Sequence, residues 1–206
     1  MARKAASATQ QARPPTHRAS GAVPREVRII GGQWKRTKLA VADKPGLRPT
    51  PDRVRETLFN WLGHDLAGWR CVDAFAGTGA LGLEAASRGA SEVLLVEQDA
   101  DLVSQLRATQ ARLQATTVKI ERGNGLSALA RLAPASIDLI FLDPPFDANL
   151  FEKALASAGP AVAPGGLIYL ESPSAWNDAA LAPYRLTCLR HLKAGVVHAH
   201  LLGRAA

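Results

Sequence analysis

The segment Asp143-Pro144-Pro145-Phe146 combines residue types that suit the binding of a planar amino group. It follows the apolar run 137–142, which predicts a buried strand. Asp143 offers carboxylate oxygens, and because proline lacks an N–H, the local backbone presents mainly carbonyl acceptors. Phe146 adds a flat face for stacking. Taken alone, the segment is better explained as a strand followed by a Pro-Pro turn, so the rest of the chain must decide between the two interpretations.

The second motif, Gly77-Thr78-Gly79-Ala80-Leu81-Gly82, lies between a predicted strand and a predicted helix. Its G-x-G-x-x-G spacing is typical of dinucleotide binding, although by itself it is weak evidence. Asp73 precedes the glycines, where its carboxylate would repel a pyrophosphate but attract the ammonium and sulfonium of S-adenosylmethionine. Glu97, at the end of the next strand, can accept from the ribose hydroxyls of either cofactor. The charges therefore favour S-adenosylmethionine over NAD.

Alternating strands and helices are predicted to position both motifs. The predicted strands cover residues 70–73, 92–97, 118–122, 137–142 and 167–171, and the helices cover 81–88, 101–113, 125–132 and 150–158. The fifth strand follows a predicted turn at 164–166, and two closing strands at 184–190 and 196–202 form a predicted hairpin. The pattern predicts an α/β fold, a doubly wound, mostly parallel, seven-stranded Rossmann-like sheet with helices on both faces. Ligands of such sheets bind at the carboxyl ends of the strands, where the chain places Asp73, Glu97, Asn124 and Asp143.

The basic residues are concentrated ahead of this fold. Residues 1–55 contain 13 Lys and Arg against three acids, a net charge of +10, whereas residues 56–206 contain 12 against 15, a net charge of −3. A polyanion is the natural partner of such an end. Residues 26–48 are predicted to form a basic hairpin arm. The residues predicted to contact nucleic-acid phosphates and bases are Arg28, Trp34, Lys35, Arg36, Lys38, Arg48 and Arg53. For Trp34, packing against the domain is an equally good explanation.

A helix is predicted at residues 51–62, between the arm and the core. Thr50 suits its N-cap and Gly63 its end. An apolar stripe recurs at helical spacing, formed by Val54, Leu58, Trp61 and Leu62. Arg53 and Arg55 are predicted to lie near the exposed start of this helix.

Composition narrows the class of protein. With 206 residues and 47% hydrophobic content, the chain is long enough for one domain with a full core, placed at 49–206. Residues 1–25 are predicted to be a disordered basic tail, with an organelle transit peptide as the less favoured alternative. Two distant cysteines, Cys71 and Cys188, predict neither a disulfide framework nor a metal site. No apolar run reaches membrane-spanning length, and we expect a cytoplasmic protein.

The two motifs together resemble the amino-methylating class I methyltransferases. The resemblance rests on Asp73-Ala74-Phe75-Ala76-Gly77-Thr78-Gly79 followed by Asp143-Pro144-Pro145-Phe146. The leading stretches 28–34, 47–50 and 52–60 resemble more narrowly the bacterial 16S ribosomal RNA (guanine-N2)-methyltransferase family, RsmD, from about Val27 to the C-terminus. This resemblance implies S-adenosylmethionine-dependent methylation of the exocyclic amine of one guanine in 16S ribosomal RNA. The implied partner is that RNA or a small-subunit assembly particle, and we expect a monomer without a metal.

The resemblance also implies a role for each site residue. The residues implied to bind the cofactor are Asp73, Phe75, Gly77, Gly79, Glu97 at the ribose and Asn124 at the adenine amine. Phe75 is explained equally well as a core residue. The residues implied to be catalytic are Asp143, Pro144, Pro145 and Phe146. Asp143 and the Pro144 carbonyl would accept the two hydrogens of the guanine amine, which aims its lone pair at the methyl carbon, and Phe146 would stack on the base.

Three alternatives remain open. The first is an amino-methyltransferase acting on adenine in DNA or on a protein glutamine, the second an NAD-dependent oxidoreductase, and the third a catalytically idle RNA-binding module. One hypothesis concerns base choice. Guanine presents adjacent donors at N1 and N2, whereas adenine places an acceptor beside its amine, so the acceptor-only carboxylate of Asp143 favours guanine.

Overall fold

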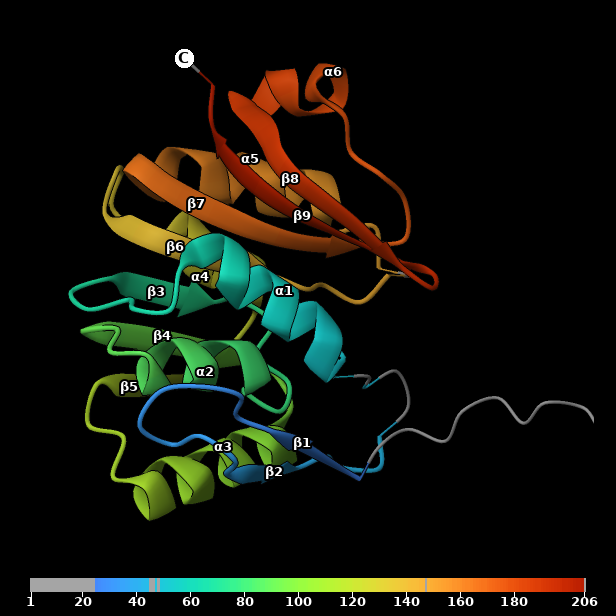
Figure 1. Ribbon diagram of the computed structural model, residues 1–206. Helices are drawn as coiled ribbons and strands as arrows, with labels where there is room; N and C mark the ends of the chain where they lie inside the picture. Colours follow the sequence, from blue (N-terminus) through green and yellow to red (C-terminus); the bar gives the residue numbers. More distant parts are fainter. Residues whose placement is uncertain (1–24, 45–46, 48, 147, 206) are drawn as a thin grey trace, which may run out of the picture.

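A seven-stranded sheet forms the centre of the protein. The computed structural model describes residues 25–44, 47, 49–146 and 148–205. The strand order is β5-β4-β3-β6-β7-β9-β8, with β9 antiparallel to both of its neighbours and the strands from β5 to β7 parallel (Figure 1). The strands are β3 Arg70–Asp73, β4 Glu92–Glu97, β5 Val118–Arg122, β6 Ile137–Leu142, β7 Val162–Ser172, β8 Leu186–Ala194 and β9 Val197–Arg204. The predicted α/β fold is confirmed, and the predicted bounds of β3 to β6 coincide with the structure.

Helices cover both faces of this sheet. They are α1 Asp52–Leu62, α2 Ala80–Ser87, α3 Ala100–Leu113, α4 Gly125–Ala130, α5 Phe151–Ala161 and α6 Asp178–Leu181, followed by a 3₁₀ turn at Ala182–Tyr184. Apolar side chains of α1, α2 and α3 belong to one buried cluster and those of α4, α5 and α6 to another, so the two sets of helices pack on opposite faces (Figure 1). The arrangement is the doubly wound one that the alternating pattern predicts.

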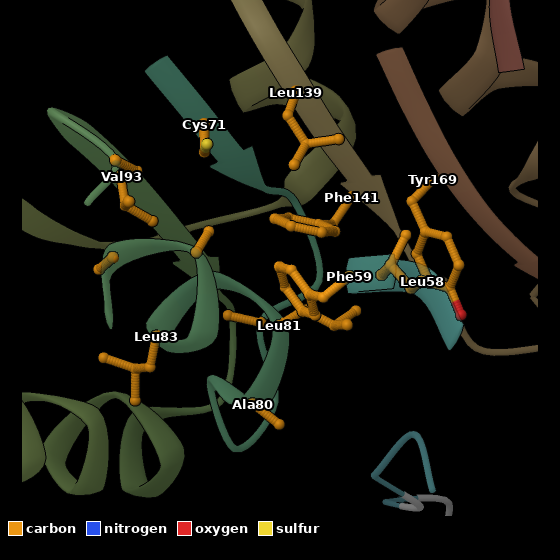
Figure 2. Close-up of a cluster of buried hydrophobic side chains, with 14 of the residues drawn as sticks. Leu58, Phe59, Cys71, Ala80, Leu81, Leu83, Val93, Leu139, Phe141 and Tyr169 are labelled. Carbon is orange, nitrogen blue, oxygen red and sulfur yellow. The ribbon is translucent and has the colours of Figure 1, made fainter. Parts of the chain in front are cut away.

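Aromatic packing fixes the end of β6 on the first of these faces. Figure 2 shows Phe141 of β6 between Phe59 of α1 and Tyr169 of β7. The ring centroids of Phe141 lie 6.3 Å from those of both neighbours, at tilted and edge-to-face angles that aromatic pairs favour. All three side chains are buried. Because Phe141 lies two residues before Asp143, this packing holds the start of the Asp-Pro-Pro-Phe segment in place.

Strand β7 is longer than predicted. The predicted turn at 164–166 is wrong, since these residues lie inside β7, where the pairing with β6 shifts between Ile137 and Leu139. Gly165 has φ +77, and a Cβ at Gly166 would lie 3.0 Å from the carbonyl oxygen of Ile137. The Pro-Gly-Gly signal therefore marks an irregularity within a strand and not its boundary.

The basic arm is a hairpin that is docked on α2. Strands β1 Glu26–Arg28 and β2 Lys38–Ala40 pair antiparallel, which confirms the predicted hairpin. The connection between them lies against α2, where the N–H groups of Ile30 and Gly31 donate to Glu84 at 2.6 and 2.7 Å. Gly32 has φ +73, and a Cβ there would lie 1.8 Å from the carbonyl oxygen of Ser87, so only glycine fits. The arm is therefore held in a fixed position on the core.

The start of α1 differs from the prediction. Pro51 precedes the helix, no side chain caps it, and the Thr50 hydroxyl donates instead to Glu171 of β7. Arg55, predicted to be near the exposed start, is fully buried. Its guanidinium donates to the Thr50 carbonyl and to Asp52 and lies 3.7 Å from the Glu84 carboxylate. A buried ion-pair network thus replaces the solvated charge that the sequence indicated.

Two predictions fall on parts of the chain that the structure does not describe. The predicted basic tail lies almost wholly within residues 1–24, and Arg48 of the predicted RNA-contacting set is likewise outside the described residues. Within the described part of the chain, no helix is both long and apolar enough to cross a bilayer.

Candidate active site

Three carboxylates meet at the carboxyl edge of the sheet. Asp73 ends β3, Asp143 directly follows β6, and Glu171 lies near the end of β7. Because β3 pairs with β6 and β6 with β7, with Leu142 opposite Leu170, Asp143 and Glu171 are next to each other across the two strands. The sequence predicted Asp73 and Asp143 at this edge but assigned no role to Glu171. Its position at the end of the strand after Asp-Pro-Pro-Phe was the available signal.

These carboxylates are poorly hydrated. Asp73 is 1% exposed and Glu171 3%, while Asp143 is partly exposed. Burial raises the pKa of Asp73 to about 7, although the N–H groups of Gly82 and Phe75 lower it. The pKa of Asp143 is raised well above its usual range, first by loss of hydration and then by the charges of Glu171 and Asp73. Burial also raises the pKa of Glu171, opposed by hydrogen bonds from Thr50 and Tyr169. Such a cluster favours the arrival of a cation.

Asp73 has an unsatisfied acceptor. Its Oδ2 accepts from the Gly82 N–H at 3.1 Å, whereas its Oδ1 is buried and has no hydrogen-bond partner. An unpaired buried oxygen costs free energy, and a donor brought by a ligand would remove that cost. The donor that fits a carboxylate best is a cationic one.

The glycine motif places its three glycines in different roles. Gly77 and Gly79 have left-handed φ angles of +52 and +77, and Gly79 precedes α2. A Cβ at Gly79 would lie 2.6 Å from a Leu106 methyl, and one at Gly82 would lie 2.2 Å from a Leu95 methyl. Packing within the protein therefore explains Gly79 and Gly82. A Cβ at Gly77 would have one neighbour within 4 Å, a Leu47 methyl at 3.1 Å, so Gly77 is the least enclosed of the three.

Glu97 and the segment before α1 complete this edge. Glu97 Oε2 accepts from the Gly77 N–H at 2.9 Å, and its Oε1 accepts from the Asp99 N–H at 2.8 Å. Lys44, between the arm and α1, forms ion pairs with Asp99 at 2.6 Å and Asp101 at 2.9 Å. Leu47 thus lies beside the glycine loop, and Lys44 lies beside the start of α3. Lys44 lies in no motif, and the stretch 47–50 that begins with Leu47 gave no indication of this position.

Asn124 and Phe75 lie near α4, on the face of the sheet that α4 and α5 cover. Asn124 is exposed, and its Oδ1 accepts from the Ser127 N–H at 3.1 Å, so it caps α4. One lone pair of that oxygen remains for a ligand amine. Phe75 is partly buried against the second apolar cluster, and its ring would lie 3.1 Å from a Cβ at Gly125. Both residues therefore have structural roles, and cofactor contact stays a prediction for each.

The Asp-Pro-Pro-Phe segment leads from β6 to α5. Pro144 is buried, Pro145 is exposed and Phe146 is partly exposed. The Phe146 ring lies 6.1 Å from that of Phe151, tilted by 51°, so the first residue of α5 supports it. Two surface hollows of the protein lie elsewhere, one between the arm and α3 and one beside α6. Among the described residues, no group of three or more His, Cys, Asp or Glu is placed to hold a metal ion.

The predicted RNA-contacting residues lie on the arm and the start of α1. Arg28, Lys35, Arg36 and Arg53 are exposed there. Lys38, also exposed, pairs with Glu26 at 2.8 Å. Trp34 is partly buried against the core cluster, as its alternative interpretation predicts, and so offers only part of its ring for stacking. The exposed cations are the stronger part of this surface.

Comparison with known proteins gives consistent matches. A family model described as Conserved hypothetical protein 95 matches residues 27–203. Ribosomal RNA small subunit methyltransferase D of Escherichia coli K12 is 42% identical over 194 residues, which are 93% of this chain and 95% of that protein. The protein of the same name from Haemophilus influenzae is 39% identical over 84% of this chain and 91% of its own length. A solved putative methyltransferase from Escherichia coli superposes with a TM-score of 0.75 at 37% identity, covering 88% of this chain and 99% of that chain.

Proposed function

Because the chain belongs to the family of ribosomal RNA small subunit methyltransferase D, we propose that it methylates the exocyclic N2 amine of one guanine in 16S ribosomal RNA with S-adenosylmethionine. The observation that carries the proposal is the position of Asp143, with its Pro-Pro-Phe continuation, beside the unsatisfied Asp73 at one edge of the sheet. The substrate is the RNA alone or within a small-subunit assembly particle.

The residues present fit S-adenosylmethionine and not NAD. Asp73 Oδ1 is a buried acceptor without a donor, and three carboxylates with raised pKa values, Asp73, Asp143 and Glu171, lie at the same edge of the sheet. A cationic ligand relieves both conditions, whereas a pyrophosphate would add like charge. Asp73 would hold the ammonium, with Glu97 at the ribose and Asn124 and Phe75 near the adenine. When bound, S-adenosylmethionine supplies an electrophilic methyl group.

Asp143 acts on the amine of the base. A guanine amine is a poor nucleophile because its lone pair is delocalised into the ring. An Asp143 oxygen and the Pro144 carbonyl accept its two hydrogens, which favours a pyramidal nitrogen with a localised lone pair. Phe146, supported by Phe151, stacks on the base. The amine proton becomes acidic on methylation, so Asp143 takes it or passes it to water. The target base must be unpaired or flipped out to reach this edge.

Nucleoside mass spectrometry tests the proposed function. Small-subunit ribosomal RNA would be isolated from cells with the gene deleted, and from the same cells with the gene restored. We expect N2-methylguanosine to be lost on deletion and regained on complementation. A change in methyladenosine instead, or no change in any methylated nucleoside, would contradict the proposal. Adding purified protein and labelled S-adenosylmethionine to the undermethylated subunits should restore the same nucleoside.

Cofactor affinity is expected to depend on pH through Asp73. Its raised pKa of about 7 means that the folded protein without ligand keeps a proton there, and loses stability as pH rises from about 4 to about 7. An ammonium binds the ionised carboxylate, so binding releases that proton. We expect S-adenosylmethionine to bind about fivefold or more tightly at pH 7.5 than at pH 6. Calorimetry in buffers of different ionisation enthalpy measures both affinity and proton release. Asp73→Asn should bind weakly with a flat profile, and a flat profile for the wild type would show that Asp73 is not the cation acceptor.

The arm should supply phosphate contacts. Arg36 is exposed at the arm's tip, so Arg36→Gln should weaken RNA binding and reduce the salt slope by about 0.7 log units per lost single-strand contact. Fluorescence anisotropy with a labelled ribosomal RNA fragment at several salt concentrations measures both. Lys119→Gln is the matched control, because Lys119 is exposed on β5 and paired with Glu92 away from the arm. Equal slopes for Arg36→Gln and the wild type would exclude Arg36 from the RNA surface.

A further inference from the structure

The hairpin formed by β8 and β9 extends past the edge that carries the carboxylates. Strand β9 runs antiparallel to β7, and its last pair with β7 joins His198 to Ser172, the residue after Glu171. Only one further pair, Ala194 with Val197, lies beyond this point, and it is formed by β8 and β9 alone. Figure 1 shows the turn of this hairpin projecting beyond the end of β7. Glu171 lies near that end of β7, and Asp143 directly follows the neighbouring strand β6. We refer to residues 189–198 as the hairpin tip.

Three histidine rings stack at the base of the hairpin tip. The ring centroid of His191 lies 5.1 Å from that of His198, with 12° between planes, and 4.7 Å from that of His200, with 24° between planes. His191 Nε2 and His198 Nδ1 are 2.9 Å apart, so one of the two donates to the other. The register pairs His191 with His200 and Lys193 with His198, which puts all four side chains on one face of the hairpin.

The innermost ring is fixed and neutral. His200 is buried, its Nε2 accepts from the Trp176 N–H at 3.0 Å, and its Nδ1 lies 3.3 Å from the Leu170 carbonyl. A ring that accepts at one nitrogen and donates at the other carries no charge. Burial, first of all, lowers the pKa of His200 to about 4. His191 is exposed and His198 partly exposed, so the fixed ring supports two rings that a ligand can reach.

The surroundings of the stack are cationic and apolar. The hairpin tip contains Arg190 and Lys193 but no Asp or Glu, whereas Arg185 and Arg204 lie at the other end of the hairpin. In the part of the chain that the structure describes, the exposed large hydrophobic residues are Leu189, 44% exposed, and Val196, 74% exposed. Both belong to the hairpin tip. A protein surface that combines stacked rings, positive charge and exposed apolar groups is suited to bind single-stranded nucleic acid.

We propose that the hairpin tip is a second RNA-contacting surface, in which His191 and His198 stack on an unpaired base and Lys193 contacts a phosphate. The inference rests on the proposed function, since the RNA is the methylated substrate. The sheet order places the hairpin at one end of the molecule, while the basic arm is docked on α2. The site of Asp143 lies between the two. An RNA strand that contacts both the arm and the hairpin tip is held on both sides of the target nucleotide. This keeps the nucleotide at the site while it is flipped out.

Steady-state kinetics test the hairpin tip. The substrate is the small ribosomal subunit from cells that lack their own small-subunit ribosomal RNA (guanine-N2)-methyltransferase. We expect His191→Ala and Lys193→Ala each to raise KM for the subunit about three- to tenfold, with kcat and the affinity for S-adenosylmethionine unchanged. Arg204→Ala is the matched control for Lys193→Ala. It removes the same positive charge, but at the opposite end of β9. Its KM should equal that of the wild type.

Cross-linking identifies what the hairpin tip touches. A photoreactive amino acid at Val196, a site with little packing to lose, should cross-link to ribosomal RNA when mixed with the same subunits. A cross-link to ribosomal protein alone, or wild-type KM values for both tip variants, would overturn the inference while the proposed function stands. If the wild-type protein does not methylate the subunit at all, the proposed function and the inference both fail.

Discussion

Replacement of Asp143 by Ala is expected to slow methyl transfer about a hundredfold or more, with little change in the affinity for S-adenosylmethionine. The side chain is the acceptor that orients the amine, and the two prolines that follow it have no side-chain acceptor that could replace it. A loss of orientation affects the rate after both substrates are bound. Single-turnover methylation of undermethylated small subunits measures that rate directly.

The Asp143 variants should be folded and somewhat more stable than the wild type at neutral pH. The pKa of Asp143 is raised in the folded protein by burial and by the charges of Glu171 and Asp73. A carboxyl group with a raised pKa lowers stability as pH rises above its unfolded value, because the folded state then binds more protons than the unfolded state. Removing the group removes that cost. Thermal unfolding at pH 5 and pH 8 should therefore show a gain in Tm for Asp143→Asn that grows with pH.

Asp138→Asn is the matched control for this pair of results. Asp138 lies near the opposite end of β6, where its Oδ2 accepts from the Arg70 N–H at 2.8 Å. Its replacement should leave the methylation rate unchanged. Rates within threefold of the wild type for Asp143→Ala would exclude Asp143 as the orienting acceptor.

Asp143→Asn adds a test of base choice, since an amide carries a donor that suits adenine. An unchanged preference for guanine with retained activity would contradict the proposed role of the carboxylate in specificity.

The sequence predicted β3, β4 and β6 well because each is a short, mostly apolar run that ends at or just before an acidic residue. Asp73, Glu97 and Asp143 could be placed at one edge for the same reason, since parallel strands with intervening helices bring their carboxyl ends together. Glu171 occupies the same kind of position. It was missed because it precedes no motif, and its contacts with Thr50 and Tyr169 exist only in the folded chain.

Buried charge was the feature that the sequence could not supply. Arg55 follows Asp52 and Arg53 in a polar helix start, and nothing in that pattern distinguishes it from its exposed neighbour. Its burial depends on Glu84, which is 29 positions away on α2.

The hairpin tip was missed for a different reason. The net charge of −3 over residues 56–206 combines the acid-free segment 185–206 with residues 56–184, which contain 8 Lys and Arg against 15 Asp and Glu.

Replacement of Glu84 by Gln is expected to lower the free energy of unfolding by about 3–5 kcal/mol, because it leaves buried cations unpaired. Glu84 is fully buried and accepts from Arg88 Nε at 2.9 Å and from the N–H groups of Ile30 and Gly31, and it lies 3.7 Å from Arg55. A glutamine keeps one acceptor oxygen but turns two donor hydrogens toward groups that are themselves donors. The substitution therefore weakens the docking of the arm on α2 as well as the packing of the core.

Urea unfolding followed by circular dichroism measures this loss, with Glu92→Gln as the control. Glu92 is an exposed partner of Lys119, and its replacement should change the free energy of unfolding by less than about 1 kcal/mol. Because Glu84 holds both the arm and the guanidinium beneath it, the Glu84 variant should also expose the arm to protease near Gly31 before the core unfolds. Equal losses for the two glutamate variants, or an arm that stays protected in Glu84→Gln, would mean that apolar packing of the arm suffices without the buried ion pairs.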